Sequence, residues 1–440
     1  MSQTICLNAR WVIPVDDARV LERHSVVIEQ DRIAAVLPQA EAARRYGGDA
    51  IVDLNEHALL PGFVNAHTHA AMSLFRGLAD DLPLMDWLQK HIWPAEGRWV
   101  SPPFMHDGVR LSVAEMIKGG VTCINDMYFF PDATARAVRE LGIRACVGLV
   151  VIDFPTAWAQ HADEYIDKAL KLHDELRDTP LLTTAFAPHA PYTVGDAALE
   201  RIRTFADEID IPIHMHVHET AHEVQEAQRQ QGLRPLARLD RLGLLTPRMM
   251  AVHMTQLTDE EIALVAARGV HVLHCPESNL KIASGFCPVH KLAQAGVNIA
   301  VGTDGAASNN DQDMLGELRT AALLAKGVSG DPTAVPALAA LRMATLNGAK
   351  AIGLDDRIGS ITPGKAADLV AIDLSSLATE PVYDPISQVV YATGRDQVTD
   401  VWIAGRRVLE SRRLTTVDEA ALRQAARAWR DKIASADRGN

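Results

Sequence analysis

The sequence predicts an α/β protein in which a (β/α)8 TIM-type barrel carries a small β-sandwich domain built from both chain termini. Three observations lead to this prediction. The chain has 440 residues, which is long for one compact domain but suits a barrel with a satellite domain. Eight short apolar runs alternate with helical patterns along the middle of the chain. Runs rich in Val and Ile, broken by polar turns, occur again at both ends.

Residues 1–58 form the N-terminal part of the predicted β domain. Their strand candidates are residues 4–15, 25–36 and 50–54, which are separated by polar turns. These runs contain no helical repeat of apolar residues, so we expect short strands in this part of the chain.

Residues 59–362 form the predicted barrel. Its strand candidates are residues 60–65, 121–125, 144–152, 181–187, 211–217, 249–253, 270–274 and 297–302. Eight parallel strands are the number that closes a barrel of this type, and helical patterns fill the segments between them.

Residues 363–440 complete the β domain and end in a helix. After Pro363-Gly364-Lys365, strand-like runs return at residues 367–372 and 398–403, and an Ala/Arg-rich helix is expected over residues 419–434. Because both ends of the chain are rich in strands, we expect the termini to meet in one small domain.

Composition and charge narrow the class of protein. Hydrophobic residues make up 48% and charged residues 22%, which is typical of a globular protein. The formal net charge of -13 disfavours nucleic acid and anionic membranes as partners. No apolar run reaches the roughly 18 residues of a membrane span, and no leader peptide is recognisable. The five cysteines are scattered and never spaced C-x-x-C, so we expect reduced thiols and a cytoplasmic protein.

The first candidate site is the pair His67 and His69 at the end of the first barrel strand. Alternate residues of a strand share a face, so both imidazoles can point into the barrel mouth and bind one cation. Two structural histidines, each bonded to backbone groups, would give the same H-x-H pattern. The pair alone therefore does not establish a metal site.

Further candidates lie at the ends of later strands. His214, His216 and His218 alternate along the fifth strand, and their spacing does not choose a ligand among them. Glu219 follows just past that strand, where a carboxyl group could exchange protons with a substrate or simply be solvated.

His253 ends the sixth strand and Asp304 follows the eighth. Alone, a histidine at a strand end is more often structural than catalytic, and an aspartate before glycine is normally a turn residue. The active sites of such barrels, however, lie at the carboxyl ends of the strands.

Taken together, these residues resemble the metal centre of the amidohydrolase superfamily, and the resemblance spans nearly the whole chain. It implies that His67, His69, His216 and Asp304 hold one divalent metal, with His216 selected because it stands in an H-x-x-E pattern with Glu219. Residues 181–189 lack the lysine of two-metal members, which implies a mononuclear centre. Three histidines and one aspartate suit Zn²⁺ and also admit Fe²⁺ or Mn²⁺.

The stretches 61–69, 74–81, 275–285 and 302–310 resemble the chlorohydrolase and deaminase branch of this superfamily. The stretch 87–96 is most similar to 5′-methylthioadenosine/S-adenosylhomocysteine deaminases. This resemblance implies that Glu96 binds the ribose hydroxyls and that His189 contacts the nucleoside, with Arg144 as a candidate for a substrate carboxylate. A dimer or larger homo-oligomer is also implied.

The resemblance implies a hydrolytic deamination at purine C6 that releases ammonia. Asp304 would take a proton from the attacking water, His253 would orient the resulting hydroxide, and Glu219 would protonate N1. Glu219 and Asp304 would thereby also contact the substrate.

Two alternatives remain open. The same site could serve a deaminase of a free base (guanine, 8-oxoguanine or cytosine) or a triazine chlorohydrolase. A base or triazine has no ribose for Glu96 to bind. A non-catalytic scaffold is disfavoured because all four candidate ligands are present together with Glu219 and His253.

Overall fold

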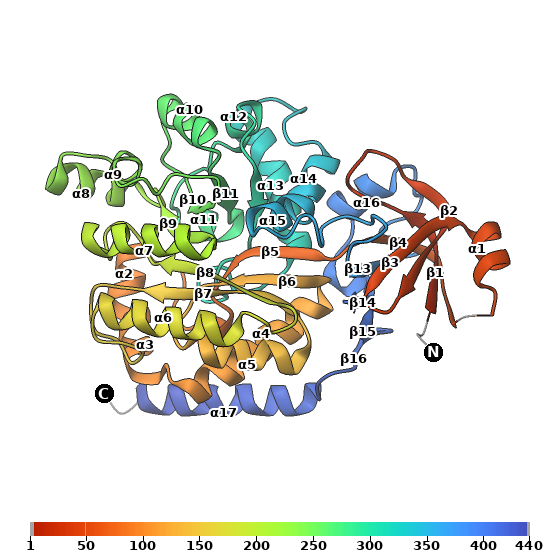
Figure 1. Ribbon diagram of the computed structural model, residues 1–440, viewed down its shortest axis with the longest axis horizontal. Helices are drawn as coiled ribbons and strands as arrows, with labels where there is room; N and C mark the ends of the chain where they lie inside the picture. The colour runs from red at the N-terminus through yellow and green to blue at the C-terminus, as the bar shows by residue number, and fades with distance from the viewer. Residues whose placement is uncertain (1–3, 49, 438–440) are drawn as a thin grey trace.

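The computed structural model describes residues 4–48 and 50–437, which form two eight-stranded sheets and the helices that cover them (Figure 1). One sheet is a parallel near-barrel whose strands follow one another in chain order. Its strands are β5 (Phe63–Thr68), β6 (Val121–Asp126), β7 (Arg144–Val151), β8 (Leu182–Pro188), β9 (Ile213–Val217), β10 (Met249–His253), β11 (His271–His274) and β12 (Ile299–Val301). The predicted fold class is therefore confirmed.

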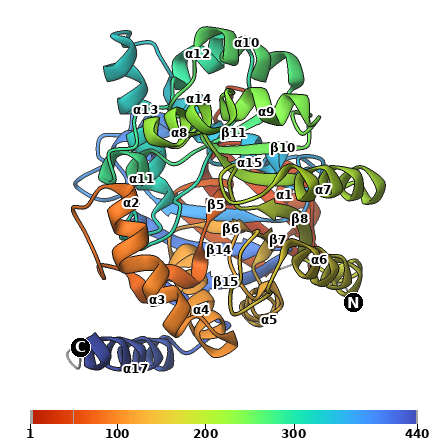
Figure 2. The ribbon, with the colours of Figure 1, turned by 90° about the vertical axis from the view of Figure 1, so that its left-hand side faces the viewer.

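Helices surround the barrel strands, as the end view in Figure 2 shows. They are α4 (Pro102–Lys118), α5 (Pro131–Leu141), α6 (Ala162–Leu176), α7 (Asp196–Ile209), α8 (Ala221–Gln231), α9 (Pro235–Arg241), α10 (Asp259–Arg268), α11 (Pro276–Lys281), α12 (Val289–Gln294), α13 (Met314–Ser329), α14 (Ala337–Met343) and α15 (Leu346–Ala351). Local sequence sets their ends. For example, Thr258 and Glu261 form a capping box at the start of α10, and Gly269 ends that helix at φ 69°.

The first and last barrel strands meet through hydrogen bonds near their carboxyl ends. The backbone N–H of Asp304 donates to the carbonyl of His67 at 3.0 Å, and the N–H of Thr303 donates to Asn65 Oδ1 at 3.0 Å. At Gly302 an added Cβ would lie 2.5 Å from the backbone nitrogen of His67. Glycine therefore permits the close approach that brings Asp304 beside the first strand.

The second sheet joins strands from both ends of the chain. Its order is β16-β15-β14-β13-β4-β1-β2-β3, with β4 pairing antiparallel to β13. The strands are β1 (Thr4–Val12), β2 (Leu21–Glu29), β3 (Arg32–Pro38), β4 (Ala50–Pro61), β13 (Leu369–Asp373), β14 (Val398–Ile403), β15 (Arg406–Glu410) and β16 (Arg413–Leu414). Leu7 and Ile33 from one half share a buried core with Leu369 and Trp402 from the other. The sheet therefore closes over a core of its own.

Most predicted strands differ from the observed ones by a few residues at their ends, and two predicted runs each cover parts of two strands. The run 60–65 belongs to two strands, because Leu60 ends β4 with Pro61 while Phe63 begins β5. Gly62 lies between them, where an added Cβ would be 2.1 Å from Thr122 Cγ2. The run 25–36 contains parts of β2 and β3. Helix α1 (Gln39–Tyr46) has no counterpart in the sequence analysis.

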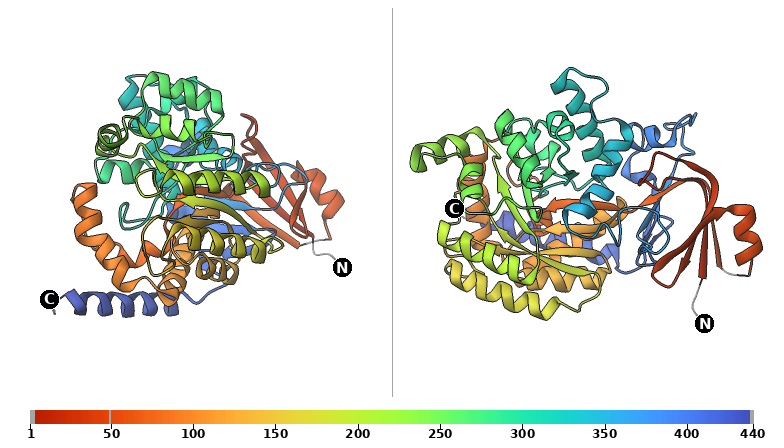
Figure 3. Two further views of the ribbon diagram at one scale, coloured as in Figure 1. Left: turned by 60° about the vertical axis from the view of Figure 1, so that its left-hand side comes forward. Right: turned by 45° about the horizontal axis from the view of Figure 1, so that its top comes forward.

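The β domain adjoins the amino ends of the barrel strands. Arg144, the first residue of β7, forms a two-pronged ion pair of 2.9 and 3.1 Å with Asp368, just before β13. Both side chains are buried. The carboxyl ends of the barrel strands consequently open on the side away from the β domain, which Figure 3 shows at one end of the molecule.

The last helix, α17 (Glu419–Asp437), packs along the flank of the barrel (Figure 1). Trp429 Nε1 donates to Asp107 Oδ2 at 2.9 Å, and its ring meets that of Phe104 at 5.2 Å. Within the described residues, no helix is both long and apolar enough to cross a membrane.

Candidate metal centre and active-site pocket

The carboxyl ends of the barrel strands surround a cavity of about 210 Å³. Seven of the eight predicted site residues line it: Glu96, His189, Glu219, His253, His69, His216 and Asp304. The eighth, His67, is fully buried and contacts three of these side chains. The structure thus brings together residues that are up to 237 positions apart in the sequence.

Three distances among four of these side chains are those expected between ligands of one metal ion. His67 Nε2 lies 3.2 Å from His216 Nε2 and 3.4 Å from Asp304 Oδ1, and His69 Nε2 lies 3.3 Å from Asp304 Oδ1. A tetrahedral ion with bonds of 2.0–2.1 Å would hold its ligand atoms about 3.3 Å apart. These three distances match neighbouring ligands of one ion. The donor atoms gather in two groups of three, His67 with His69 and Asp304, and His67 with His216 and His253, which share His67.

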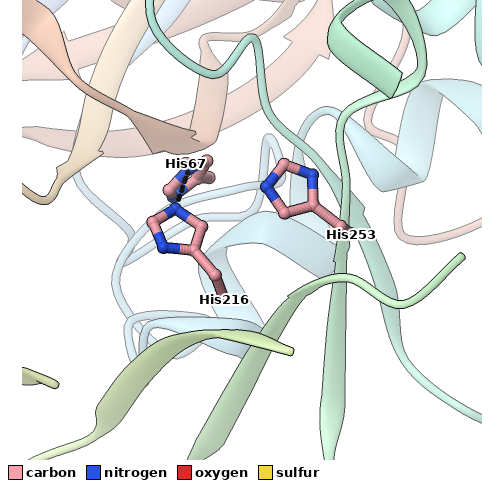
Figure 4. Close-up of side chains that lie close together, drawn as sticks. All are labelled: His67, His216 and His253. Carbon is pink, nitrogen blue, oxygen red and sulfur yellow. Dashed lines mark hydrogen bonds between the residues drawn. The ribbon is translucent and has the colours of Figure 1, made fainter. Parts of the chain in front are cut away.

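Hydrogen bonds behind the rings fix which nitrogens face this centre. His216 Nδ1 donates to the carbonyl of His189 at 2.9 Å, and His69 Nδ1 donates to the carbonyl of Met127. A carbonyl only accepts, so in each neutral ring Nε2 carries a lone pair. The Nε2 atoms of His67 and His216 face each other (Figure 4). Imidazole nitrogens that converge beside the Asp304 carboxylate are a donor set that fits a divalent metal.

Burial keeps the His67 and His216 rings neutral, as metal binding requires. It lowers the pKa of His67 to about 4 and that of His216 well below its usual value. For Asp304, burial opposes ionisation, but the neighbouring imidazoles of His67 and His69 outweigh it and hold the pKa of the carboxyl group well below its ordinary range.

His253 lies beside the four donors. Its ring stacks on that of His216 at 5.4 Å, and His67, His216 and His253 form a second group of three whose nitrogens approach one another (Figure 4). His253 Nδ1 lies 2.9 Å from Asn279 Oδ1, so Nδ1 carries the proton. His253 Nε2 therefore carries a lone pair and lies 3.7 Å from Glu219 Oε1.

Helix α11 supplies two buried side chains that the sequence analysis did not assign to the site. Ser278 Oγ donates to Asp304 Oδ2 at 2.7 Å, while Asn279 bonds His253. Both residues follow immediately after β11, at the carboxyl end of a barrel strand. Their place after a barrel strand is the sequence signal that could have identified them, because the active sites of such barrels lie at the carboxyl ends of the strands.

The strand ends that present these residues are strained. His218, His253 and Asp304 have φ values of 53°, 72° and 61°, in the left-handed region that non-glycine residues rarely adopt. They follow or end β9, β10 and β12. Such strain typically persists where the surrounding structure holds a functional side chain in place.

Glu219 is buried at the cavity wall, and Glu223 holds its backbone. The N–H groups of Glu219 and His218 donate to the Glu223 carboxylate at 2.7 and 3.1 Å. Burial raises the pKa of Glu219, and the charge of Asp304 raises it further, while His253 opposes the shift. A raised pKa suits a carboxyl group that must carry a proton near neutral pH.

The outer wall of the cavity carries Glu96. This residue lies on α3 (Trp93–Trp99), which follows α2 (Leu84–Trp87) and the π-helical turn η2 (Leu88–Ile92). The Tyr128 hydroxyl donates to Glu96 Oε1 at 2.6 Å. Glu96 lines the cavity and is half-buried, and burial raises the pKa of its carboxyl group to about 7 although the Tyr128 bond lowers it.

His189 lies just past β8 on the same wall. Its Nδ1 lies 3.0 Å from Thr193 Oγ1, and its carbonyl accepts from His216. Burial lowers the pKa of His189 to about 3, so its ring is neutral. Trp87 and Trp93 also line the cavity.

Three other candidates do not belong to the cavity wall. Arg144 is paired with Asp368 beside the β domain, so its prediction as a ligand of a substrate carboxylate is wrong. His214 Nε2 is hydrogen-bonded to His67 Nδ1 at 2.9 Å, on the side of the His67 ring away from the candidate metal centre. His218 Nε2 accepts from the backbone of Leu236 at 3.2 Å, which gives it a structural contact.

Comparison with protein families agrees with this geometry. The model of the amidohydrolase family matches residues 58–408. A protein of Teredinibacter turnerae named 5-methylthioadenosine/S-adenosylhomocysteine deaminase is 50% identical over 97% of this chain and 97% of its own. One of the same name from Saccharophagus degradans is 47% identical over 98% and 96%, respectively.

Solved structures share the fold. An adenosine deaminase from Xanthomonas campestris with bound zinc superposes with a TM-score of 0.96 and is 56% identical, covering 98% of both chains. An atrazine chlorohydrolase from Arthrobacter aurescens, complexed with zinc, has a TM-score of 0.91 over 97% of this chain and 99% of its own. At 24% identity, that second likeness concerns the fold alone.

Proposed function

This chain belongs to the amidohydrolase family, and we propose that it is a hydrolase that deaminates 5′-methylthioadenosine and S-adenosylhomocysteine, and adenosine by extension, to the inosine analogue and ammonia. One observation carries the proposal. A single cavity contains both a group of side chains suited to hydrolysis at a metal and the Glu96 carboxyl group on its outer wall. The names of the relatives support the same substrate class.

The metal in this proposal is one zinc ion held by His67, His69, His216 and Asp304. The short distances from His67 to His216 and Asp304 and from His69 to Asp304 support this assignment, as does the zinc bound by the Xanthomonas campestris relative. The same nitrogen and oxygen donors also admit Fe²⁺ or Mn²⁺. When bound, the ion supplies Lewis-acid chemistry that makes water a nucleophile near neutral pH.

The residues around the metal would handle the protons of the reaction. Asp304 takes a proton from the attacking water, and Ser278 holds its carboxylate by the bond to Oδ2. His253 accepts a hydrogen bond from the nucleophile at Nε2, because Asn279 keeps the ring proton on Nδ1.

Glu219 protonates purine N1 as water adds to C6. Asp304 then gives its proton to the departing amino group, and Glu219 regains one from the new hydroxyl at C6. The raised pKa of Glu219 supports this role, because a proton donor must be protonated before the chemical step.

The outer wall would position the nucleoside. Glu96, as a carboxylate, accepts hydrogen bonds from the two ribose hydroxyls, and neutral His189 provides a second polar contact to the substrate. A free base or a triazine offers no hydroxyl pair for Glu96. This difference favours a nucleoside over those substrates.

A substrate panel tests the proposal. Zinc-loaded protein is mixed with 5′-methylthioadenosine, S-adenosylhomocysteine, adenosine, adenine and guanine, and the ultraviolet change on deamination is followed. Turnover of the nucleosides but not the bases is expected. Turnover of the free bases, or none of the nucleosides with zinc bound, would contradict it.

A further inference from the structure

We propose that Tyr128 is a positioning residue for nucleoside substrates: its hydroxyl holds the Glu96 carboxylate in the orientation that receives the ribose hydroxyls. The inference rests on the proposed function, because it assumes that Glu96 binds ribose. Tyr128 lines the cavity and is 6% exposed, and it has no part in the chemistry described above.

The contact leaves Glu96 free to bind a ligand. The Tyr128 hydroxyl donates to Oε1 at 2.6 Å, a short bond of the kind formed with charged acceptors. A carboxylate has about four lone-pair positions across its two oxygens. One position bonded to Tyr128 leaves three, which is enough for two hydroxyl groups. Tyr128 thus restricts the rotation of the Glu96 carboxylate and leaves enough of its lone-pair positions for the ribose hydroxyls.

The backbone beside Tyr128 is fixed to the candidate metal centre. The carbonyl of Met127 accepts from His69 Nδ1, and the N–H of Met127 donates to the carbonyl of Thr68 at 3.0 Å. The Tyr128 ring itself lies 5.9 Å from that of His69. One dipeptide therefore contacts both the metal-binding side and the ribose-binding side of the cavity.

This link spans two parts of the chain that come from different elements. Glu96 lies on α3, in a segment that lines the cavity, whereas Tyr128 lies two residues past the end of barrel strand β6. The Tyr128–Glu96 bond thus sets the distance between the ribose carboxylate and the reaction centre. The same bond lowers the pKa of Glu96, which burial raises, and so favours the ionised acceptor.

The experiment compares Tyr128→Phe with the wild-type enzyme on two substrates. One is 5′-methylthioadenosine, and the other is 2′,3′-dideoxyadenosine, which lacks both ribose hydroxyls and is measured by its KM or by its Ki as a competitor. Loss of one hydrogen bond to a charged group predicts a KM for 5′-methylthioadenosine about tenfold higher, with kcat within about twofold. The value for the dideoxynucleoside should stay within about twofold.

Two controls separate positioning from general damage. Tyr383→Phe makes the same change at a tyrosine that is 92% exposed and lies outside the cavity, and should leave the KM unchanged. In a double-mutant cycle, Tyr128→Phe should add little to Glu96→Ala, because each variant removes the Tyr128–Glu96 bond.

Several results would overturn the inference. These are an unchanged KM for 5′-methylthioadenosine, an equal loss on both substrates, or zinc missing from the Tyr128→Phe protein. If the wild-type enzyme turned over no nucleoside at all, the proposed function would fail and this inference with it. The wild-type measurement alone therefore distinguishes the two failures.

Discussion

Replacing Glu219 with glutamine removes the acid that we assign to N1 while preserving the shape of the side chain. Glu219 is 8% exposed, and its Oε1 lies 3.7 Å from His253 Nε2. Its backbone is held independently of its carboxyl group. The N–H donates to Glu223 at 2.7 Å and the carbonyl accepts from Thr255 Oγ1 at 2.7 Å. We therefore expect the variant to fold and to keep its metal.

The size of the effect follows from these contacts. A positioned acid or base contributes about 10²–10⁴-fold to a rate, and an amide cannot donate a proton as a carboxylic acid does. Because Glu219 is buried, bulk water has little access to N1 to replace it, which places the loss of kcat near the middle of that range, at about 10³-fold. The KM should change by less than about threefold, since the substrate contacts of Glu96 and His189 are untouched.

Steady-state deamination of 5′-methylthioadenosine and zinc content per chain test this prediction together. Glu226→Gln is the matched control, because Glu226 lies two turns along the same segment, is paired with Arg229 at the surface, and does not touch the donor cluster. Near wild-type turnover by Glu219→Gln would refute the proton-transfer role. Loss of zinc from that variant would show that Glu219 acts on the metal instead.

Three further predictions follow from the contacts around the cavity. Asn279→Ala frees the His253 ring and should lower kcat about 10–100-fold with zinc retained; loss of zinc would instead make Asn279 a determinant of metal binding. Removing the metal with a chelator should abolish turnover and lower Tm, and added Zn²⁺ should restore both; activity of the stripped protein would contradict the metal assignment. Asp368→Ala leaves Arg144 buried and unpaired, so denaturant unfolding should show a loss of about 3–5 kcal/mol with an unchanged KM, whereas a raised KM would return Arg144 to the substrate site.

The sequence predicted the barrel well because its strands are short, buried runs rich in apolar residues. The predicted run 249–253 coincides with β10, and the remaining barrel strands differ by a few residues at their ends. The first strand was less accurate, because Leu60 of β4 and Phe63 of β5 belong to one continuous apolar stretch. Only the hydrogen-bond partners show that they lie in different sheets. Helix α1 was missed because Ala42 is its one buried residue.

The candidate site was predicted wherever a titratable residue ends a strand, as His253 and Asp304 do. Side chains that act through others were not found in this way. Ser278, Asn279 and Tyr128 each bond a partner 26 to 32 positions away, so only the folded chain brings the pairs together. The arginine misassigned to substrate binding looked available in the sequence because its partner lies 224 positions further along the chain.

The most direct test of the account is a crystal structure of the zinc-loaded protein with the inosine product of 5′-methylthioadenosine, located by anomalous scattering at the zinc edge. We predict one anomalous peak within about 2.0–2.2 Å of donor atoms from His67, His69, His216 and Asp304. The ribose hydroxyls should contact Glu96, and N1 should face Glu219. A zinc ion bound by His253 in place of His69 would contradict the predicted metal centre. A ribose directed away from Glu96 would contradict the predicted substrate contact.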